Sequence, residues 1–218
     1  MSQVMSKIVE KQVEKHMDKK AAAQPYAKKP VNENRRLAVK VLAAAIAVAL
    51  LVIAPLKLNG YRNRVEKVFK NGTSTQYVDS VAGYVRQSSS AATDILNTFT
   101  ARYGETDATR KLTKAIEQLG KASDENEIMR LYEEMYAGAN EVYNLYRAEY
   151  KRDTGKEPDK SDKVYKDWDD LYSYYNKDIA NNGYWEKAAK YNAARESFPA
   201  NVIGPLFGID KMPAKIGS

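Results

Sequence analysis

The chain has 218 residues, a net charge of +7, no cysteine and a single histidine, His16. Without cysteine it has no disulfide, zinc-thiolate site or thiol nucleophile, and one histidine in the tail excludes His-based triads and His-ligated zinc sites elsewhere. The positive charge is concentrated in residues 1–40, which carry ten basic and four acidic side chains, whereas residues 57–218 carry 25 and 24. We therefore expect anionic lipid headgroups, and not nucleic acid, to be the partner of this charge.

The first 36 residues have the composition of a basic tail followed by a linker. Residues 2–20 place lysines every four positions opposite loosely grouped apolar side chains, a pattern typical of a helix that lies on a membrane or docks on a partner. A partly disordered, solvated tail fits the same residues. Residues 21–34 contain Pro25 and Pro30 among Ala, Gln, Asn and Lys, which indicates a linker.

Residues 37–56 form the longest apolar run in the chain. They contain one charge, Lys40, whose long stem can reach the lipid headgroups from the first turn. At 1.5 Å per residue the run makes about 30 Å of helix, the hydrocarbon thickness of a bilayer. The sequence therefore predicts a transmembrane helix. The basic residues expected to flank it are Arg35, Arg36, Lys40 and Lys57.

The two alternatives to a transmembrane helix are a cleavable signal peptide and a buried helix of a soluble protein. A cleavable signal peptide has a short basic region before its apolar core, whereas 36 residues precede this run. A buried helix of a soluble protein fits residues 41–54 poorly, because no face of them is polar. We expect a single-pass cell-membrane protein with a soluble domain at residues 57–218.

That domain is expected to be all-α, an antiparallel helical bundle. Apolar side chains recur every three or four residues in several segments, and no alternation is long enough for a strand pair. Asp124 followed by Glu127 predicts a helix start, and Lys151 to Ser161 predicts a loop. Residues 57–70 either continue the span or form a separate short helix. The periodic segments are 81–103, 112–119, 128–146, 164–179 and 184–198.

Fifteen of the sixteen tyrosines lie in this domain. One interpretation is an aromatic recognition surface. The other is that tyrosine replaces leucine and phenylalanine along the helix seams, with the ring inside and the hydroxyl at the edge. Because the domain has few other aromatic side chains, we expect tyrosine to fill the core.

The sequence predicts no catalytic, cofactor or metal site. It contains no phosphate-binding glycine series, and its densest acidic group has no calcium-loop spacing. Because lysines are interleaved with these acidic residues, we expect the group to be a solvated, ion-paired face. The alternative is a weak cation site. The acidic residues are Asp159, Asp162, Asp167, Asp169 and Asp170.

Residues 191–208 contain Tyr191-Asn192, a short spacer, Phe198-Pro199-Ala-Asn201, two aliphatic residues and then Phe207-Gly208. This pattern resembles the signature that closes proteins of the LemA family. Residues 62–66, Arg-Asn-Arg-Val-Glu, resemble the segment that follows the span in that family. The resemblance implies a membrane-anchored antiparallel helical bundle with no established enzymatic activity.

The C-terminal signature is expected to be structural. Phe198 would pack into the end of the bundle, Pro199 disfavours helical geometry at its predecessor, and Asn201 would cap the next turn. The residues assigned to this motif are Tyr191, Asn192, Phe198, Pro199, Asn201, Phe207 and Gly208.

Two classes of function remain. The first is a non-enzymatic scaffold or adaptor, anchored in the membrane, whose helical domain binds unidentified protein partners or a second copy of itself. The second is a carboxylate-dependent enzyme, or an accessory subunit, that acts on envelope substrates. The missing catalytic groups favour the scaffold.

The balance of basic residues favours a cytoplasmic N-terminus with the helical domain outside. Six basic residues lie within about twenty residues before the span and five lie after it, which nearly balances under the positive-inside rule. Four further lysines in the tail, attracted by the anionic cytoplasmic leaflet, decide the direction.

Overall fold

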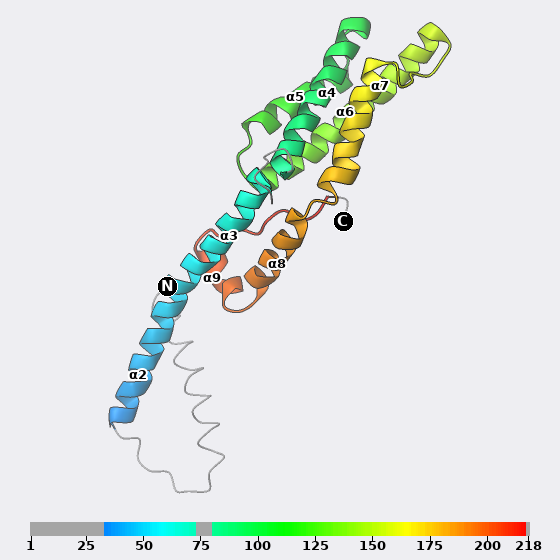
Figure 1. The fold of residues 1–218 in the computed structure, drawn as a ribbon. Coiled ribbons are helices and arrows are strands. Elements are labelled where there is room, and N and C mark those ends of the chain that lie inside the picture. The colour runs from blue at the N-terminus through cyan, green and yellow to red at the C-terminus, as the bar shows by residue number, and fades with distance from the viewer. Residues whose placement is uncertain (1–32, 73–79, 217–218) are drawn as a thin grey trace, which may run out of the picture. The chain divides into compact units, whose positions relative to one another are not determined.

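The computed structural model describes residues 33–72 and 80–216, and all regular secondary structure in these ranges is helical (Figure 1). The all-α prediction is confirmed for this part of the chain. The predicted tail helix at residues 2–20 and most of the linker lie outside the described residues.

The N-terminal apolar run belongs to one continuous helix. It consists of α2 (Glu33–Val48), a π-helical stretch η1 (Ala49–Ile53) and α3 (Ala54–Asn71). Residues 57–70 therefore continue the apolar helix and do not form a separate one. The helix ends where Gly72 adopts a φ of 79°, a conformation that only glycine takes without strain.

The remaining helices follow the predicted periodic segments. Helix α5 packs against α6, and α4 packs against α5, α6 and α7. These helices are α4 (Val81–Tyr103), α5 (Asp107–Lys121), α6 (Glu125–Thr154), α7 (Lys163–Ser173) with a π-helical continuation η3 (Tyr174–Ile179), α8 (Tyr184–Glu196) and α9 (Ala200–Leu206).

Local signals account for several helix ends. Asp124 accepts hydrogen bonds from the backbone amides of Asn126 and Glu127 at 2.9 and 3.1 Å, so the predicted start of α6 is confirmed. The end of α6 differs from the prediction, because the helix runs to Thr154, inside the expected loop 151–161. It stops at Gly155, which has a φ of 72°.

Tyrosine fills the core, as predicted. Tyr132, Tyr146, Tyr184 and Tyr191 are each less than 2% exposed or at that limit. Two of their hydroxyls are satisfied inside the domain, because Tyr132 lies 3.0 Å from the Ser88 hydroxyl and Tyr146 donates to Asp162 at 2.7 Å. Buried tyrosine rings therefore fill core positions that leucine and phenylalanine occupy in other proteins.

Burial of these rings predicts a loss of stability in alkali. Burial is the main cause that raises the pKa values of Tyr132, Tyr146 and Tyr184 above the ordinary value of 10. Above pH 10 the unfolded chain therefore loses phenolic protons that the folded chain keeps. Stability should be constant up to that pH and then fall by about 1.4 kcal/mol per pH unit for each such tyrosine.

Denaturant unfolding at increasing pH measures this loss. Tyr132→Phe should flatten the alkaline limb, whereas Tyr172→Phe, which changes a tyrosine that is 47% exposed, serves as the matched control. A free energy of unfolding that stays constant well above pH 10 would contradict the prediction.

The chain divides into two compact units. One contains residues 1–61 and 194–210, and the other contains residues 62–193 and 211–218. Large apolar side chains that are exposed to solvent are unequally shared between them. Leu145 and Tyr172 belong to the second unit, and the other eleven belong to the first: Leu37, Val41, Leu42, Val48, Val52, Ile53, Leu56, Phe198, Val202, Leu206 and Phe207.

Candidate functional site

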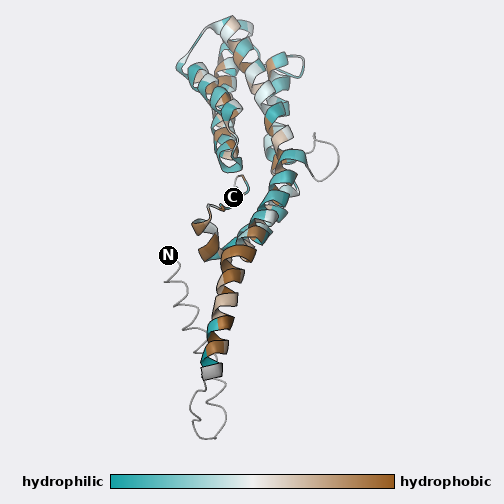
Figure 2. Cartoon of the chain, turned by 90° about the vertical axis from the view of Figure 1, so that its left-hand side faces the viewer, coloured by the Kyte–Doolittle hydropathy of each residue, from teal (hydrophilic) through white to brown (hydrophobic). Residues whose placement is uncertain are grey.

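The apolar helix is unburied along its most hydrophobic part. Its best 18-residue window has a mean hydropathy of 2.8, and none of that window is buried by the described residues. Figure 2 shows the hydrophobic colouring concentrated in this helix. By length and composition, the helix is long and apolar enough to span a membrane. A signal sequence, or the core helix of a soluble protein, can also be this long and this apolar.

The four predicted flanking residues lie on this helix, and their side chains are exposed. Arg35, Arg36 and Lys40 are in α2, and Lys57 is in α3. The 21 positions from Arg36 to Lys57 correspond to about 31 Å along a helix axis, close to the hydrocarbon thickness of a bilayer. The separation of these basic side chains therefore matches the distance between the two headgroup layers of a bilayer.

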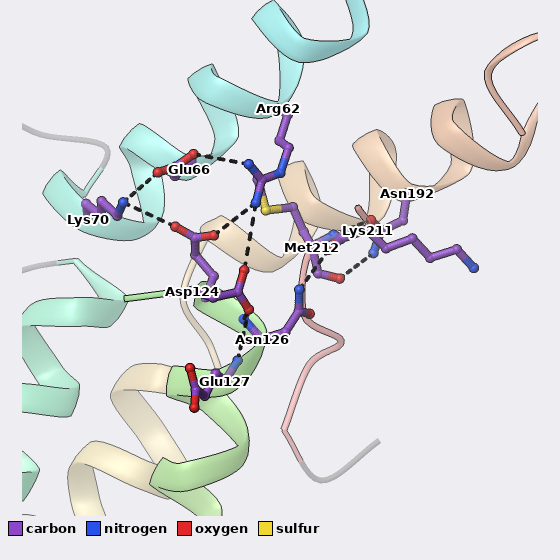
Figure 3. A network of polar contacts seen from close by, with 10 residues as sticks. Arg62, Glu66, Lys70, Asp124, Asn126, Glu127, Asn192, Lys211 and Met212 are labelled. Carbon is purple, nitrogen blue, oxygen red and sulfur yellow. Dashed lines mark hydrogen bonds and ion pairs between the residues drawn. The ribbon is translucent and has the colours of Figure 1, made fainter. Parts of the chain in front are cut away.

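A partly exposed ion-pair network joins α3 to the first turn of α6 (Figure 3). Its centre is Glu125, which is 2% exposed. One Glu125 oxygen lies 3.4 Å from the Arg62 guanidinium, and the other lies 3.4 Å from the Lys70 amine. Arg62 also lies 3.9 Å from Asp124 and 3.7 Å from Glu66, and Glu66 pairs with Lys70 at 2.5 Å.

The charges in this network stabilise one another. The hydrogen bond from Lys70 lowers the pKa of Glu66, and the same bond raises the pKa of Lys70. Both groups therefore stay charged at neutral pH, whereas a general acid or base needs a pKa near the working pH. Asp124 and Glu125 also lie at the N-terminus of α6, where the helix dipole favours negative charge. These properties are those of a structural network.

Three buried polar atoms around the network accept or donate no hydrogen bond within the described part of the chain. They are Arg62 Nε, Glu125 Oε1 and the hydroxyl of Tyr184. Burial, followed by the charge of Glu125, raises the pKa of Tyr184. Tyr184 packs its ring edge-on against Phe69, with the centroids 5.2 Å apart. The Tyr184 hydroxyl is thus held, protonated, in the field of the Glu125 carboxylate.

The first half of the C-terminal motif lies in the same unit as the network. Tyr191 is fully buried, and Asn192 makes two hydrogen bonds with the backbone of Met212, at 2.8 and 2.9 Å. The side-chain amide of Asn126 donates to the carbonyl of Lys211 at 3.0 Å. Figure 3 shows these side chains between the C-terminal segment and the start of α6, next to the ion-pair network.

The second half of the motif differs from the prediction. Phe198 is 77% exposed, so the prediction that it fills the end of the bundle is wrong. Helix α8 ends at Glu196, and the periodic stripe of buried residues does not continue past that end. Asn201 lies inside α9 and does not cap it, because the capping position is Pro199 and no side chain bonds there. Phe207 is 48% exposed, and Gly208 has a φ of 62°.

Arg195 organises this second half and was not singled out by the sequence. It is 7% exposed and donates from Nε to the carbonyl of Ile209 at 2.8 Å and from a terminal nitrogen to the carbonyl of Ala200 at 3.1 Å. A Cβ placed on Gly204 would lie 2.0 Å from Arg195 Nε. The signal in the sequence is a glycine inside a short apolar segment, where it permits a close approach.

Three of the five residues of the predicted acidic face make hydrogen bonds or ion pairs within the protein. Asp162 caps α7 through the amide of Tyr165 at 3.0 Å and accepts from Tyr146, while Asp167 pairs with Lys163 at 2.8 Å. Asp159 accepts from Ser161. Within residues 33–72 and 80–216, no group of three or more acidic, histidine or cysteine side chains is arranged to hold a metal ion.

The described residues thus define an all-helical protein with one helix long and apolar enough to cross a membrane. Comparisons with protein-family models, curated proteins and solved structures find no match for the chain.

Proposed function

We propose that the chain is a non-enzymatic, single-pass cell-membrane protein whose helical domain acts as a scaffold or adaptor. The observation that carries the proposal is the distribution of exposed apolar side chains. Seven of them, 49–69% exposed, lie on α2, η1 and α3, between Leu37 and Leu56. Apolar surface of this extent in water strongly favours a membrane or a partner, and the basic residues at both ends favour the membrane.

The helical domain is proposed to be an antiparallel bundle of the LemA type. Packing of α4 against α5, α6 and α7, together with long helices joined by short loops, supports this arrangement. The first LemA-like segment and the start of the second make contacts within the larger unit. Arg62 and Glu66 belong to the ion-pair network, Asn192 bonds the C-terminal segment at Met212, and Tyr191 is buried beside it in sequence.

The scaffold is proposed to bind protein partners or a second copy of itself. Support comes from the ion-pair network, in which Glu66 and Lys70 stay charged, and from the predominantly polar surface of the second unit, where Leu145 and Tyr172 are the large apolar side chains exposed. A polar surface of this kind suits reversible contacts in water better than a permanent apolar interface.

Site-specific photo-crosslinking in intact membranes tests the scaffold. A photoreactive residue at Leu145 or Tyr172 should give a discrete crosslinked band, and a differently tagged second copy of the chain in that band would identify self-assembly. The matched control is Lys114, an exposed position on α5. Bands of equal intensity and spread at all three positions would contradict a specific scaffold surface.

The alternative function, a carboxylate-dependent enzyme acting on envelope substrates, is tested by substituting Asp167, Asp169 and Asp170 together with asparagine. If the triple variant folds and keeps its crosslinks but no longer supports the cellular role of the natural chain, the enzyme is favoured. A retained phenotype favours the scaffold.

The proposed orientation places the N-terminus in the cytoplasm. Because the natural chain has no cysteine, single cysteines can report it directly. Ser90→Cys, an exposed position on α4, should react with a membrane-impermeant maleimide in intact cells or spheroplasts, whereas Ser2→Cys should react only after permeabilisation. The reverse labelling pattern would reverse the orientation without affecting the span.

A further inference from the structure

The segment around α9 is unusual in a chain that is 29% charged. Residues 197–209 contain no Asp, Glu, Lys or Arg, which makes this the longest uncharged stretch after the apolar helix. Charged residues return at once on both sides, with Glu196 before it and Asp210 and Lys211 after it. A stretch this apolar at the surface needs something other than water to cover it.

The segment has a covered face and an open face. Ile203 and Gly204 are buried, and Gly204 lies against the Arg195 side chain. The open face is formed by large apolar side chains that are 40–77% exposed, namely Phe198, Val202, Leu206 and Phe207. We call these four residues the α9 apolar face.

The α9 apolar face belongs to the same compact unit as the apolar helix. Figures 1 and 2 both place α9 beside this helix, near the start of α3, and Figure 2 colours both as hydrophobic. Lys57, the basic residue expected at the headgroups, lies in the first turn of α3. The α9 apolar face therefore lies at the depth where the apolar helix would leave the hydrocarbon.

We propose that the α9 apolar face is a second membrane contact, inserted into the bilayer interface beside the end of the span. The proposal rests on the proposed span, because the same bilayer would cover both surfaces. The ligand is the acyl and upper headgroup region of the lipid, independent of lipid charge, since the segment carries no ionic side chain. Aromatic side chains such as Phe198 and Phe207 suit this depth.

Arg195 makes the insertion compatible with a low-dielectric environment. Backbone carbonyls that enter a membrane interface without a partner are costly. The Arg195 guanidinium satisfies the carbonyls of Ala200 and Ile209 on either side of α9, and the amide of Ile209 donates to the carbonyl of Gly204 at 2.9 Å. The inner face thus supplies the hydrogen bonds that the outer, lipid-facing side cannot.

Fluorescence quenching in vesicles tests this contact on the full-length chain. Val202→Cys and Phe207→Cys are each labelled with an environment-sensitive fluorophore, and the protein is reconstituted into neutral phosphatidylcholine vesicles. Val48→Cys, on the apolar helix, is the control for the hydrocarbon, and Lys114→Cys is the control for water. Two α9 positions guard against the misfolding of one variant, and helicity is checked by circular dichroism.

The proposal predicts that lipids spin-labelled near the headgroup quench both α9 labels, and that aqueous iodide quenches them much less than the label at position 114. If deep spin labels quench the Val48 label but iodide quenches both α9 labels freely, the proposal is overturned and the span stays intact. Access of iodide to the Val48 label as well would overturn the span. Protection of the α9 labels from both quenchers would mean that protein covers this face, which also overturns the proposal.

Discussion

Replacing Arg62 with methionine is expected to lower the free energy of unfolding by about 3 kcal/mol. Glu125, at 2% exposure, would keep only the Lys70 amine, 3.4 Å away, as a counter-charge. Breaking a buried ion pair costs about 3–5 kcal/mol because an uncompensated charge stays in the interior. The lower end of that range applies here, since Lys70 remains in place.

Denaturant unfolding of the full-length chain in detergent micelles measures this loss. Lys67→Met is the matched control, because it removes an exposed cation from the same helix and should change stability by less than about 0.5 kcal/mol. Adding Glu125→Leu to Arg62→Met removes the stranded carboxylate and should recover part of the loss. Additive losses in the double variant would show that the two side chains do not interact, contrary to the network.

Gly204→Ala is expected to destabilise the protein by about 2 kcal/mol, although alanine is the better helix former. The added Cβ would displace the Arg195 guanidinium, 2.0 Å away, from the carbonyls of Ile209 and Ala200. Two charge-assisted bonds at about 1.5 kcal/mol each outweigh the gain of about 1 kcal/mol in helix propensity.

Gly120→Ala is the matched control for Gly204→Ala within the same protein. Gly120 also lies in a helix, α5, but apart from the backbone of that helix no atom lies within 4 Å of the position of its Cβ. This substitution should stabilise the protein by about 0.5–1 kcal/mol. The midpoint temperature of unfolding, monitored by circular dichroism, should therefore shift in opposite directions for the two variants. An increase in stability for Gly204→Ala would mean that Arg195 is not fixed where the geometry places it.

Local patterns predicted much of this structure. The start of α6 follows from Asp124 and Glu127, and the buried face of α4 follows from the spacing between Val81 and Phe99, because both are set by neighbours within one helix. The exposure of Phe198 did not follow, because a helical stripe predicts burial only as far as the helix extends, and α8 ends two residues earlier.

The candidate sites were harder to predict because their partners are distant in sequence. Glu125 resembles an ordinary acidic residue in a first helical turn, and its burial depends on Arg62, which is 63 positions away. Nothing in a local window around Glu125 indicates that pairing. Arg195 is closer to its partners, but its role depends on the chain folding back after α9, so only Gly204 gave a signal.

The central claim is that residues 37–56 span a membrane, and alkaline carbonate extraction tests it most directly. Membranes from cells that make the chain, tagged at both ends, should retain the full-length protein with both tags in the pellet. Val48→Lys combined with Val52→Lys should release it, because each central lysine costs about 2.5–3.5 kcal/mol in insertion. Recovery of the unmutated chain in the supernatant would contradict the span. A shortened chain that lacks the N-terminal tag and the apolar residues would identify a cleaved signal sequence instead.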